Sequence, residues 1–334
     1  LKLILTNRNI SYKCIMAVYT NITHDELNSF LNLYELENLL QFSGIKEGIE
    51  NSNYLLETQN FKYILTIFEK RTNENDLPYF FILMNHLSES KTKCPQVIKD
   101  KSDKLYNYIK DKPAVITSFI EGKSLKKIEP KHCAELGMNL ARFHLSSDQL
   151  DIQRDNTLGI KHLGSLVNTI NSLHISKYSD LIEIINKEYN FLKDKIPNNL
   201  PSGIIHADLF PDNVFFINDR LSGIIDFYFA CNDYYAYELA ICINAWCFER
   251  NNEFNVSKAK HFLQQYNSIR NINKVELESL PILARAASLR FLLTRLYDEI
   301  HNVKSDLVIT KDPNEYFEKL KFHQSVKSVD EYGI

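Results

Sequence analysis

One stretch of the chain, residues 203–228, constrains its fold and chemistry more than any other. It reads G-I-I-H-A-D-L-F-P-D-N-V-F-F-I-N-D-R-L-S-G-I-I-D-F-Y, in which short apolar runs end in polar residues. Asp208 follows the first apolar run, Asn213 lies five residues further on, and Asp226 closes the last run. The segments between Asn213 and Asp226 predict a β-hairpin, which would return these two side chains to one point.

The spacing H-x-D-x-x-x-x-N, which begins at His206, is typical of a catalytic loop for phosphoryl transfer from ATP. Such a transfer depends on positioning and charge stabilisation, because its transition state is loose. We expect Asp208 to act as the general base for the acceptor hydroxyl. We expect Asn213 and Asp226 to hold Mg²⁺, since a small hard cation prefers carboxylate and amide oxygens. His206 is expected to hydrogen-bond nearby backbone, and Glu238 to tie the loop to the helix that follows it.

Each of these residues also has an ordinary explanation, because Asp and Asn beside turns are commonly Asx turns or helix caps. A lone Asp-Phe pair carries no information about function. The order of loop, hairpin and I-D-F, with apolar strand residues between them, favours the catalytic interpretation, since the structural context of the motif is present.

The chain has 334 residues, more than one hydrophobic core usually supports, so two lobes are expected. With 44% hydrophobic and 24% charged residues and a formal charge of −3, it has the composition of a soluble globular protein, and neither nucleic acid nor a membrane is expected as a partner. Its six cysteines form no C-x-x-C pair and nothing resembles a secretory signal, which favours reduced thiols and a cytoplasmic location. Residues 1–15 precede the first methionine, and we expect a disordered or mis-assigned extension there.

Residues 16–117 are expected to form a small nucleotide-binding lobe. A capping box of Thr23 and Glu26 opens a helix, and strand-like runs follow at 54–58 and 61–68. The glycine-containing loop before the first run is by itself an ordinary turn, but the distal motif favours a lid over phosphates, because glycine lets backbone N–H groups approach oxygen. The nucleotide-binding residues expected are Gly44, Gly48, Ser52, Thr66 and Lys70, with the hinge residues Ser118, Phe119 and Ile120.

Residues 118–334 are expected to form a larger, mainly helical lobe that holds the catalytic hairpin, so that the fold class is α+β. In the small lobe a further helix is expected from Asp76, as its cap, to about residue 90. Further strand-like pieces are expected at 96–98, 105–109 and 114–120. Helices of the large lobe are expected at 130–146, 179–195, 234–250, 257–269, 281–300 and 314–323.

Several longer phrases resemble a known family. H-A-D-L-F-P-D-N-V-F-F and I-D-F-Y-F-A-C-N-D resemble the aminoglycoside phosphotransferase-like branch of the protein-kinase-like fold. The chain from residue 16 onward resembles the homoserine kinases of that branch, through M-A-V-Y-T at Met16, G-I-E-N-S-N-Y-L-L at Gly48, A-I-C-I-N-A-W-C-F-E at Ala240 and R-F-L-L-T-R-L-Y-D at Arg290. The resemblance implies a two-lobed kinase fold that uses ATP and Mg²⁺ and phosphorylates the side-chain hydroxyl of L-homoserine, giving O-phospho-L-homoserine on the route to threonine. Composition and spacing alone do not indicate that acceptor.

The chain departs from the general kinase pattern in the strand at 61–68. That strand should present a lysine to the phosphates, yet the corresponding position is Thr66. The helix that follows, between Asp76 and Glu89, has no acid to pair with such a lysine. Alternation along an extended strand places Lys70 on the face of Thr66, so we expect Lys70 to supply the missing charge. A solvated lysine at a strand end is the open alternative.

An amino-acid acceptor needs a cation for its carboxylate and an anion or carbonyls for its ammonium. Arg285, Arg290 and Arg295 lie five residues apart on one predicted helix. They cannot share a face, because five residues at about 100° each leave a rotation of about 140°. The residues expected to border the acceptor are Tyr228, Asp233 and Arg290.

Two alternatives stay open. A kinase for choline, methylthioribose or an aminoglycoside would share the loop and hairpin, although a polyamine pocket would gather more acids than residues 231–246 contain. A nucleotide-binding module without turnover is suggested by Thr66, but the intact set of Asp208, Asn213 and Asp226 argues against it. The sequence does not indicate the oligomeric state.

Overall fold

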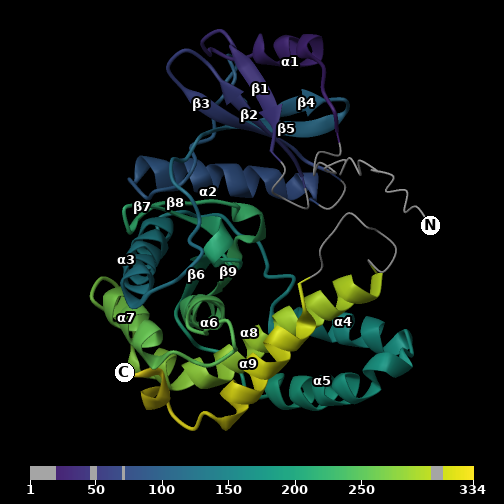
Figure 1. Ribbon diagram of the computed structural model, residues 1–334, viewed down its shortest axis with the longest axis vertical. Helices are drawn as coiled ribbons and strands as arrows, with labels where there is room; N and C mark the ends of the chain where they lie inside the picture. Colours follow the sequence, from purple (N-terminus) through teal and green to yellow (C-terminus); the bar gives the residue numbers. More distant parts are fainter. Residues whose placement is uncertain (1–19, 46–50, 70–71, 302–310) are drawn as a thin grey trace, which may run out of the picture.

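The computed structural model describes four segments of the chain, residues 20–45, 51–69, 72–301 and 311–334. They form a small lobe built on a sheet, above a larger helical lobe (Figure 1). This is the predicted α+β architecture. The extension predicted at residues 1–15, together with Gly48 and Lys70, lies outside the described residues.

The small lobe is organised by a five-stranded antiparallel sheet with the strand order β1-β2-β3-β5-β4. The strands are Gln41–Gly44 (β1), Ser52–Glu57 (β2), Lys62–Ile67 (β3), Asn107–Ile109 (β4) and Lys112–Ser118 (β5). The strand-like runs predicted at 54–58 and 61–68 are therefore confirmed as β2 and β3, in which Glu57 pairs with Lys62. The piece predicted at 96–98 is not a strand and makes only an isolated bridge from Val97 to Thr117.

Side chains on the two faces of this sheet belong to different cores. Leu65 and Ile67 of β3 join a small core beneath α1, the helix His24–Leu31. Helix α1 begins with the predicted capping box, because the Thr23 side chain accepts the Glu26 N–H and the Glu26 side chain accepts the Thr23 N–H. Phe68 belongs instead to the core of the large lobe. The sheet thus turns one face to α1 and the other to the large lobe.

Helix α2, Leu77–Glu89, lies between the sheet and the large lobe (Figure 1). Its buried residues share one core with the large lobe, so α2 packs on both neighbours. The prediction that Asp76 caps this helix was wrong. Asp76 has helical backbone angles and makes no cap bond, and its carboxylate accepts a hydrogen bond from Arg154 Nε at 2.8 Å. A strong partner elsewhere in the lobe outweighs the local preference of aspartate for a cap.

The large lobe contains the remaining helices that the structure describes. They are Pro130–Ser147 (α3), Ile160–Ser172 (α4), Ser179–Leu192 (α5), Tyr235–Trp246 (α6), Val256–Asn267 (α7), Lys274–His301 (α8) and Pro313–Ser325 (α9). Helix α4 was not predicted from the sequence, and α8 begins at Lys274, ahead of the start predicted at Pro281. Proline usually lies in the first turn of a helix, but here it lies inside α8, where the neighbouring Leu280, Leu283 and Ala284 are buried in the core. Burial of that apolar face outweighs the hydrogen bond that proline removes.

Two short antiparallel pairs lie at the centre of the large lobe. Strand β6, Ser202–Ile205, pairs with β9, Cys231–Tyr234. Strand β9 was not predicted from the sequence. Strand β7, Val214–Ile217, pairs with β8, Arg220–Ile224, and confirms the predicted hairpin. The loop between β6 and β7 and the segment after β8 therefore emerge side by side.

Two further expectations from the sequence concern the cysteines and membrane-spanning helices. The cysteines within the described segments, Cys94, Cys133, Cys231, Cys242 and Cys247, are buried and free of disulfides. Among the described helices none is long and apolar enough to cross a membrane.

Candidate active site

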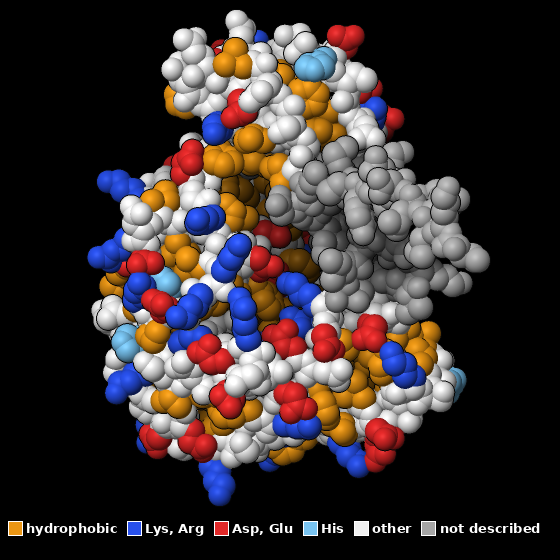
Figure 2. All heavy atoms as spheres, in the orientation of Figure 1, with side chains coloured by type: hydrophobic (Ala, Val, Ile, Leu, Met, Phe, Trp, Pro, Cys, Tyr) orange, Lys and Arg blue, Asp and Glu red, His pale blue; other side chains and the backbone are white. Residues whose placement is uncertain are grey.

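The predicted catalytic loop lies where the two lobes face each other. Figure 2 shows a hollow between them, with apolar side chains in its depth and charged side chains along its lower rim. Asp208 and Asn213 are half-buried and Asp226 is exposed. Carboxylates that are anchored in the large lobe can therefore meet a molecule bound in the hollow.

The loop has an unusual backbone at Ala207. Its φ is +62°, a left-handed conformation that L residues other than Asn and Asp rarely adopt. The Ala207 N–H donates to Glu238 Oε2 at 3.0 Å, and the His206 N–H donates to the same oxygen. On the other side, the Ala207 carbonyl accepts a hydrogen bond from Arg290 Nη1 at 2.7 Å. Buried charged groups thus hold both polar groups of the left-handed residue.

Glu238 has the role that the sequence predicted, because it ties the loop to helix α6. Its side chain is fully buried, and burial raises the pKa of the carboxyl to about 7, although the two backbone donors and the Arg290 guanidinium oppose that increase. Its second oxygen, Oε1, has no hydrogen-bond partner among the described residues.

His206 is structural, as predicted. Its Nδ1 accepts the Asp208 N–H at 3.3 Å, so Nε2 carries the proton and donates to the Ile225 carbonyl at 2.9 Å. Burial lowers the pKa of the imidazole to about 4, which keeps the ring neutral. One neutral imidazole therefore connects the backbone of Asp208 to the strand that leads to Asp226.

Asn213 joins the two halves of the site. Its side-chain amide nitrogen donates to the backbone carbonyl of Asp208 at 2.9 Å and to Asp208 Oδ2 at 3.3 Å. The backbone carbonyl of Asn213 accepts the Ile225 N–H at 3.0 Å. Since the amide nitrogen is directed at Asp208, the amide oxygen points elsewhere and can serve as a ligand. Asp226 follows Ile225 in a left-handed conformation, with φ +63° and ψ +66°. The structure brings Asp208, Asn213 and Asp226 together.

Tyr228 links this segment to the small lobe. Its ring packs edge to face against Phe68 at 5.0 Å and Phe80 at 5.7 Å between ring centroids. Burial raises the pKa of its phenol, and the neighbouring Thr66 opposes that increase. Thr66 Oγ1 in turn donates to Asn53 Oδ1 at 2.8 Å. Uncharged hydrogen-bonding groups therefore occupy the place on β3 where a lysine was expected.

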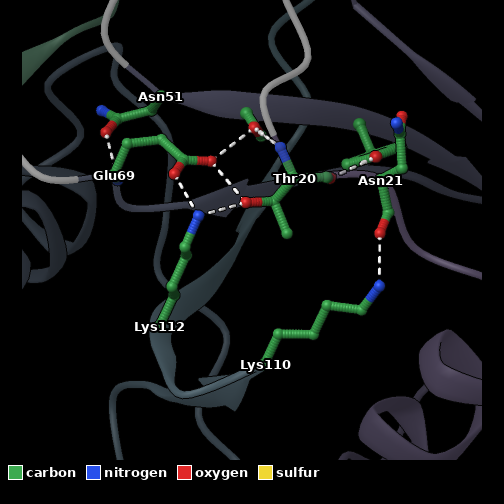
Figure 3. Close-up of polar contacts among 8 residues, drawn as sticks. Thr20, Asn21, Asn51, Glu69, Lys110 and Lys112 are labelled. Carbon is green, nitrogen blue, oxygen red and sulfur yellow. Dashed lines mark hydrogen bonds and ion pairs between the residues drawn. The ribbon is translucent and has the colours of Figure 1, made fainter.

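The other face of the sheet carries the ion pair that the sequence analysis missed. Glu69 accepts hydrogen bonds from Ser52 Oγ at 2.7 Å and Thr20 Oγ1 at 2.6 Å and forms an ion pair with Lys112 (Figure 3). The Glu69 N–H also donates to Asn51 Oδ1 at 3.2 Å. The group ties the beginnings of β2 and β5 to the end of β3. The hydroxyl of Ser52, predicted to bind nucleotide, is engaged in this group.

The predicted hinge begins at the end of β5. The Ser118 N–H donates to the Gln96 carbonyl at 2.8 Å, and the Phe119 N–H donates to the Lys62 carbonyl at 3.2 Å. Both are therefore used inside the small lobe. Among the described residues, the Ile120 N–H has no such backbone partner. Gly44, which unlike Gly48 is a described glycine of the predicted lid, is the last residue of β1 and pairs with Tyr54.

The hinge then crosses the catalytic hairpin in close contact. Gly122 has a φ of +119°, and a Cβ at this position would lie 2.9 Å from the Phe216 carbonyl oxygen. The Phe216 N–H donates to the Lys123 carbonyl at 2.9 Å. Only glycine fits this crossing, which fixes the hinge directly against β7.

The arginines of α8 face three different partners, as their spacing predicted. Arg285 makes a bidentate pair with Glu188, and Arg295 binds Glu315. Only Arg290 contacts the catalytic loop, and its exposed fraction is 2%. The sequence spacing predicted that the three arginines point in different directions. Which of them contacts the catalytic loop, 83 residues away in the sequence, depends on how α8 packs in the lobe.

Asp233 lies on β9 opposite Gly203, at the end of β6 remote from the loop. Its carboxylate accepts a hydrogen bond from Asn156 Nδ2 at 2.7 Å and another from the backbone N–H of Tyr234 at 2.7 Å. Burial raises the pKa of this carboxyl, and those two bonds oppose the increase.

Comparison with known proteins adds an independent result. Residues 41–272 match the model of a family described as the phosphotransferase enzyme family. The homoserine kinases of Parvibaculum lavamentivorans and Agrobacterium fabrum are 46% and 47% identical to this chain over 319 residues, which cover 96% of the chain and 99% of each relative. Among solved structures, the amicoumacin kinase hAmiN in complex with AMP-PNP, Ca²⁺ and Ami superposes with a TM-score of 0.69 at 14% identity, over 92% of this chain and 95% of that one.

Proposed function

The chain belongs to the homoserine kinases of the phosphotransferase enzyme family, and from that premise we propose how its own residues carry the reaction. It is an ATP-dependent kinase that phosphorylates the side-chain hydroxyl of L-homoserine to O-phospho-L-homoserine, a step of threonine biosynthesis. A small molecule is thus its substrate. The roles of the individual residues are the proposal.

Asp208 is the general base. It follows a buried strand, it is half-buried at the hollow between the lobes, and its backbone is held by His206 and Asn213. A carboxylate in that place accepts the proton of the acceptor hydroxyl as the bond to phosphorus forms. His206 is not a competing base, because both of its ring nitrogens are engaged with backbone.

Asn213 and Asp226 are the residues that would hold Mg²⁺ when ATP is bound. The donor set is suitable, since it offers an amide oxygen and an exposed carboxylate, and hard cations prefer such ligands. Among the described residues there is no cluster of three or more His, Cys, Asp or Glu that could form a complete metal cage, which is consistent with a site that the nucleotide completes. When bound, the ion neutralises charge that develops on the transferred phosphoryl group.

The nucleotide binds under the sheet, with its adenine at the hinge formed by Ser118, Phe119 and Ile120. The Ile120 N–H is the donor proposed for the base, because its two neighbours in the hinge are already bonded. Thr66 faces the same side as Phe68 and the large lobe. The proposed phosphate contacts come from Gly44, Gly48, Ser52 and Lys70, with Ser52 acting through its backbone because its hydroxyl is bound to Glu69.

Tyr228 and Asp233 are the residues proposed to border homoserine. We also infer a cytoplasmic location, because the described cysteines are reduced and buried, and no nucleic-acid or membrane partner, because the formal charge is −3.

The observation that carries the proposal is the junction of Asp208, Asn213 and Asp226, in which Asn213 bonds both to Asp208 and to the residue before Asp226. The experiment is an ADP-release assay with L-homoserine, choline, methylthioribose and an aminoglycoside as acceptors. Homoserine should be the preferred acceptor, and Asp208→Asn should lower turnover by at least about 10²-fold while ATP binding is kept.

Asp212→Asn is the matched control, because Asp212 lies in the same loop with its side chain 63% exposed and one long ion pair, 3.3 Å, to Lys311. It should retain activity. Preference for another acceptor would refute the substrate, and near-normal turnover of Asp208→Asn would refute the role of the base.

A further inference from the structure

Arg290 makes a contact that the reaction as described so far does not use. It lies on α8 with an exposed fraction of 2%, its guanidinium stacks on Phe291 at 4.6 Å, and Nη1 donates to the Ala207 carbonyl at 2.7 Å. Arginine remains charged at all ordinary pH values, and burying a charge costs free energy unless it is paired or hydrogen-bonded. Arg290 therefore places one N–H of a buried cation on one particular peptide, while its charge also favours the ionised forms of the neighbouring Glu238 and Asp233.

That peptide is the one that joins Ala207 to Asp208. A peptide group is planar, so its carbonyl oxygen and the Asp208 N–H move as one rigid unit. Arg290 binds the oxygen of this plane and His206 Nδ1 binds the N–H at 3.3 Å. The plane is therefore held at both edges, and its orientation determines where the side chain of Asp208 leaves the backbone.

The peptide needs that support, because Ala207 is left-handed, with φ +62°. Backbone strain of this kind persists only where the surroundings enforce it. Glu238 enforces it from the N–H side and Arg290 from the carbonyl side. If the carbonyl loses its donor, the peptide can rotate toward an ordinary conformation, and Asp208 moves with it.

We propose that Arg290 is a positioning residue for the general base, which acts through the Ala207–Asp208 peptide and does not bind the carboxylate of homoserine. This inference rests on the proposed function, since it takes Asp208 as the base.

The test compares Arg290→Met with Arg285→Met. Both remove an arginine of α8 that is largely buried, but Arg285 binds Glu188 and not the loop. Arg290→Met should lower kcat by about 10²-fold and leave the KM values for ATP and homoserine within about threefold, because displacement by about 1 Å has effects of that order on the chemical step. Arg285→Met should lower Tm and keep kcat per folded molecule close to that of the wild type.

A second measurement gives a result that a merely structural residue would not produce. In the Asp208→Asn background there is no base left to position, so adding Arg290→Met should lower kcat by less than about threefold more. Equal fold losses in the two backgrounds would show that Arg290 acts independently of Asp208 and would overturn the proposal. A rise of tenfold or more in the KM for homoserine with unchanged kcat would identify it as an acceptor ligand, which also overturns the proposal.

If Arg290→Met does not fold, because the buried Glu238 loses the guanidinium that favours its ionised form, Arg290→Met/Glu238→Gln replaces both ionisable groups and is compared with Glu238→Gln alone. The double variant should then show the lower kcat with unchanged KM values, and equal kcat in the two would refute the proposal. Failure of the proposed function is recognised separately, by near-normal turnover of Asp208→Asn itself. If Asp208→Asn has a strongly reduced kcat while Arg290→Met keeps the kcat of the wild type, only the inference about Arg290 is refuted.

Discussion

Glu238 offers a quantitative test of how the catalytic loop is held, because it is a fully buried acid whose only hydrogen-bond donors among the described residues are the backbone N–H groups of His206 and Ala207. Burial raises the pKa of its carboxyl from the ordinary value of 4.5 to about 7. Between these two pH values the folded protein keeps a proton that the unfolded chain releases. The free energy of unfolding therefore falls as the pH rises through this window. Since one pKa unit corresponds to about 1.36 kcal/mol, the total loss is roughly 3 kcal/mol.

The variant Glu238→Gln removes this titration but keeps an acceptor oxygen of the same shape. Its new NH₂ group is a buried donor, which costs about 1–3 kcal/mol at every pH. The absolute free energy of unfolding of the variant is therefore uninformative. The test is how that free energy changes with pH relative to the wild type. Measured by urea unfolding between pH 4.5 and pH 8, the stability of the variant relative to the wild type should improve by roughly 2–3 kcal/mol as the pH rises.

Glu188→Gln is the control, because Glu188 is a buried glutamate of the same lobe that is held by Arg285 and lies outside the loop. Removing its ion pair should destabilise the protein without touching the backbone of the catalytic loop. Parallel stability curves for Glu238→Gln and the wild type across this pH range would refute the argument, since they would mean that Glu238 ionises in the folded protein as easily as in the unfolded chain.

Three further predictions concern metal, phosphate and terminus. Asp226→Ala should abolish Mg²⁺-dependent turnover at ordinary ion concentrations, and full activity without additional Mg²⁺ would contradict its role as a ligand. Lys70→Met should raise the KM for ATP or lower kcat by about tenfold, whereas Lys112→Met, whose ammonium binds Glu69 on the other face of the sheet, should affect Tm more than ATP kinetics; the reverse pattern would assign the phosphate contact elsewhere. Deletion of residues 1–15 should leave Tm and activity unchanged, and a loss of several degrees would show that this segment is docked.

Local motifs allowed part of this structure to be predicted from the sequence. The capping box at Thr23 and the hairpin between Asn213 and Asp226 depend on residues that are close together in the sequence. Both are present as predicted. The cap at Asp76 was predicted in the same way and is absent, because Arg154, which lies far along the chain, competes for the same carboxylate. Local preference decides an element only where no stronger tertiary partner is within reach.

The supports of the catalytic loop illustrate the part that local reasoning does not reach. Four phrases carry the resemblance to homoserine kinases, and two of them begin in helices of the large lobe, one in α6 and one in α8. In the folded chain Trp246, from the first phrase, donates its indole N–H to the Leu209 carbonyl at 2.8 Å, and Arg290, from the second, donates to the Ala207 carbonyl. These contacts lie on either side of Asp208. Nothing in the composition of either phrase indicates a function, because both are mainly apolar and read as core. Their polar side chains complete the hydrogen bonds of a loop that cannot pair with a neighbouring strand, since unpaired buried backbone groups are costly. The distal helices therefore hold the backbone on both sides of Asp208, and the proposed function predicts that a substitution in them alters turnover without contact with either substrate.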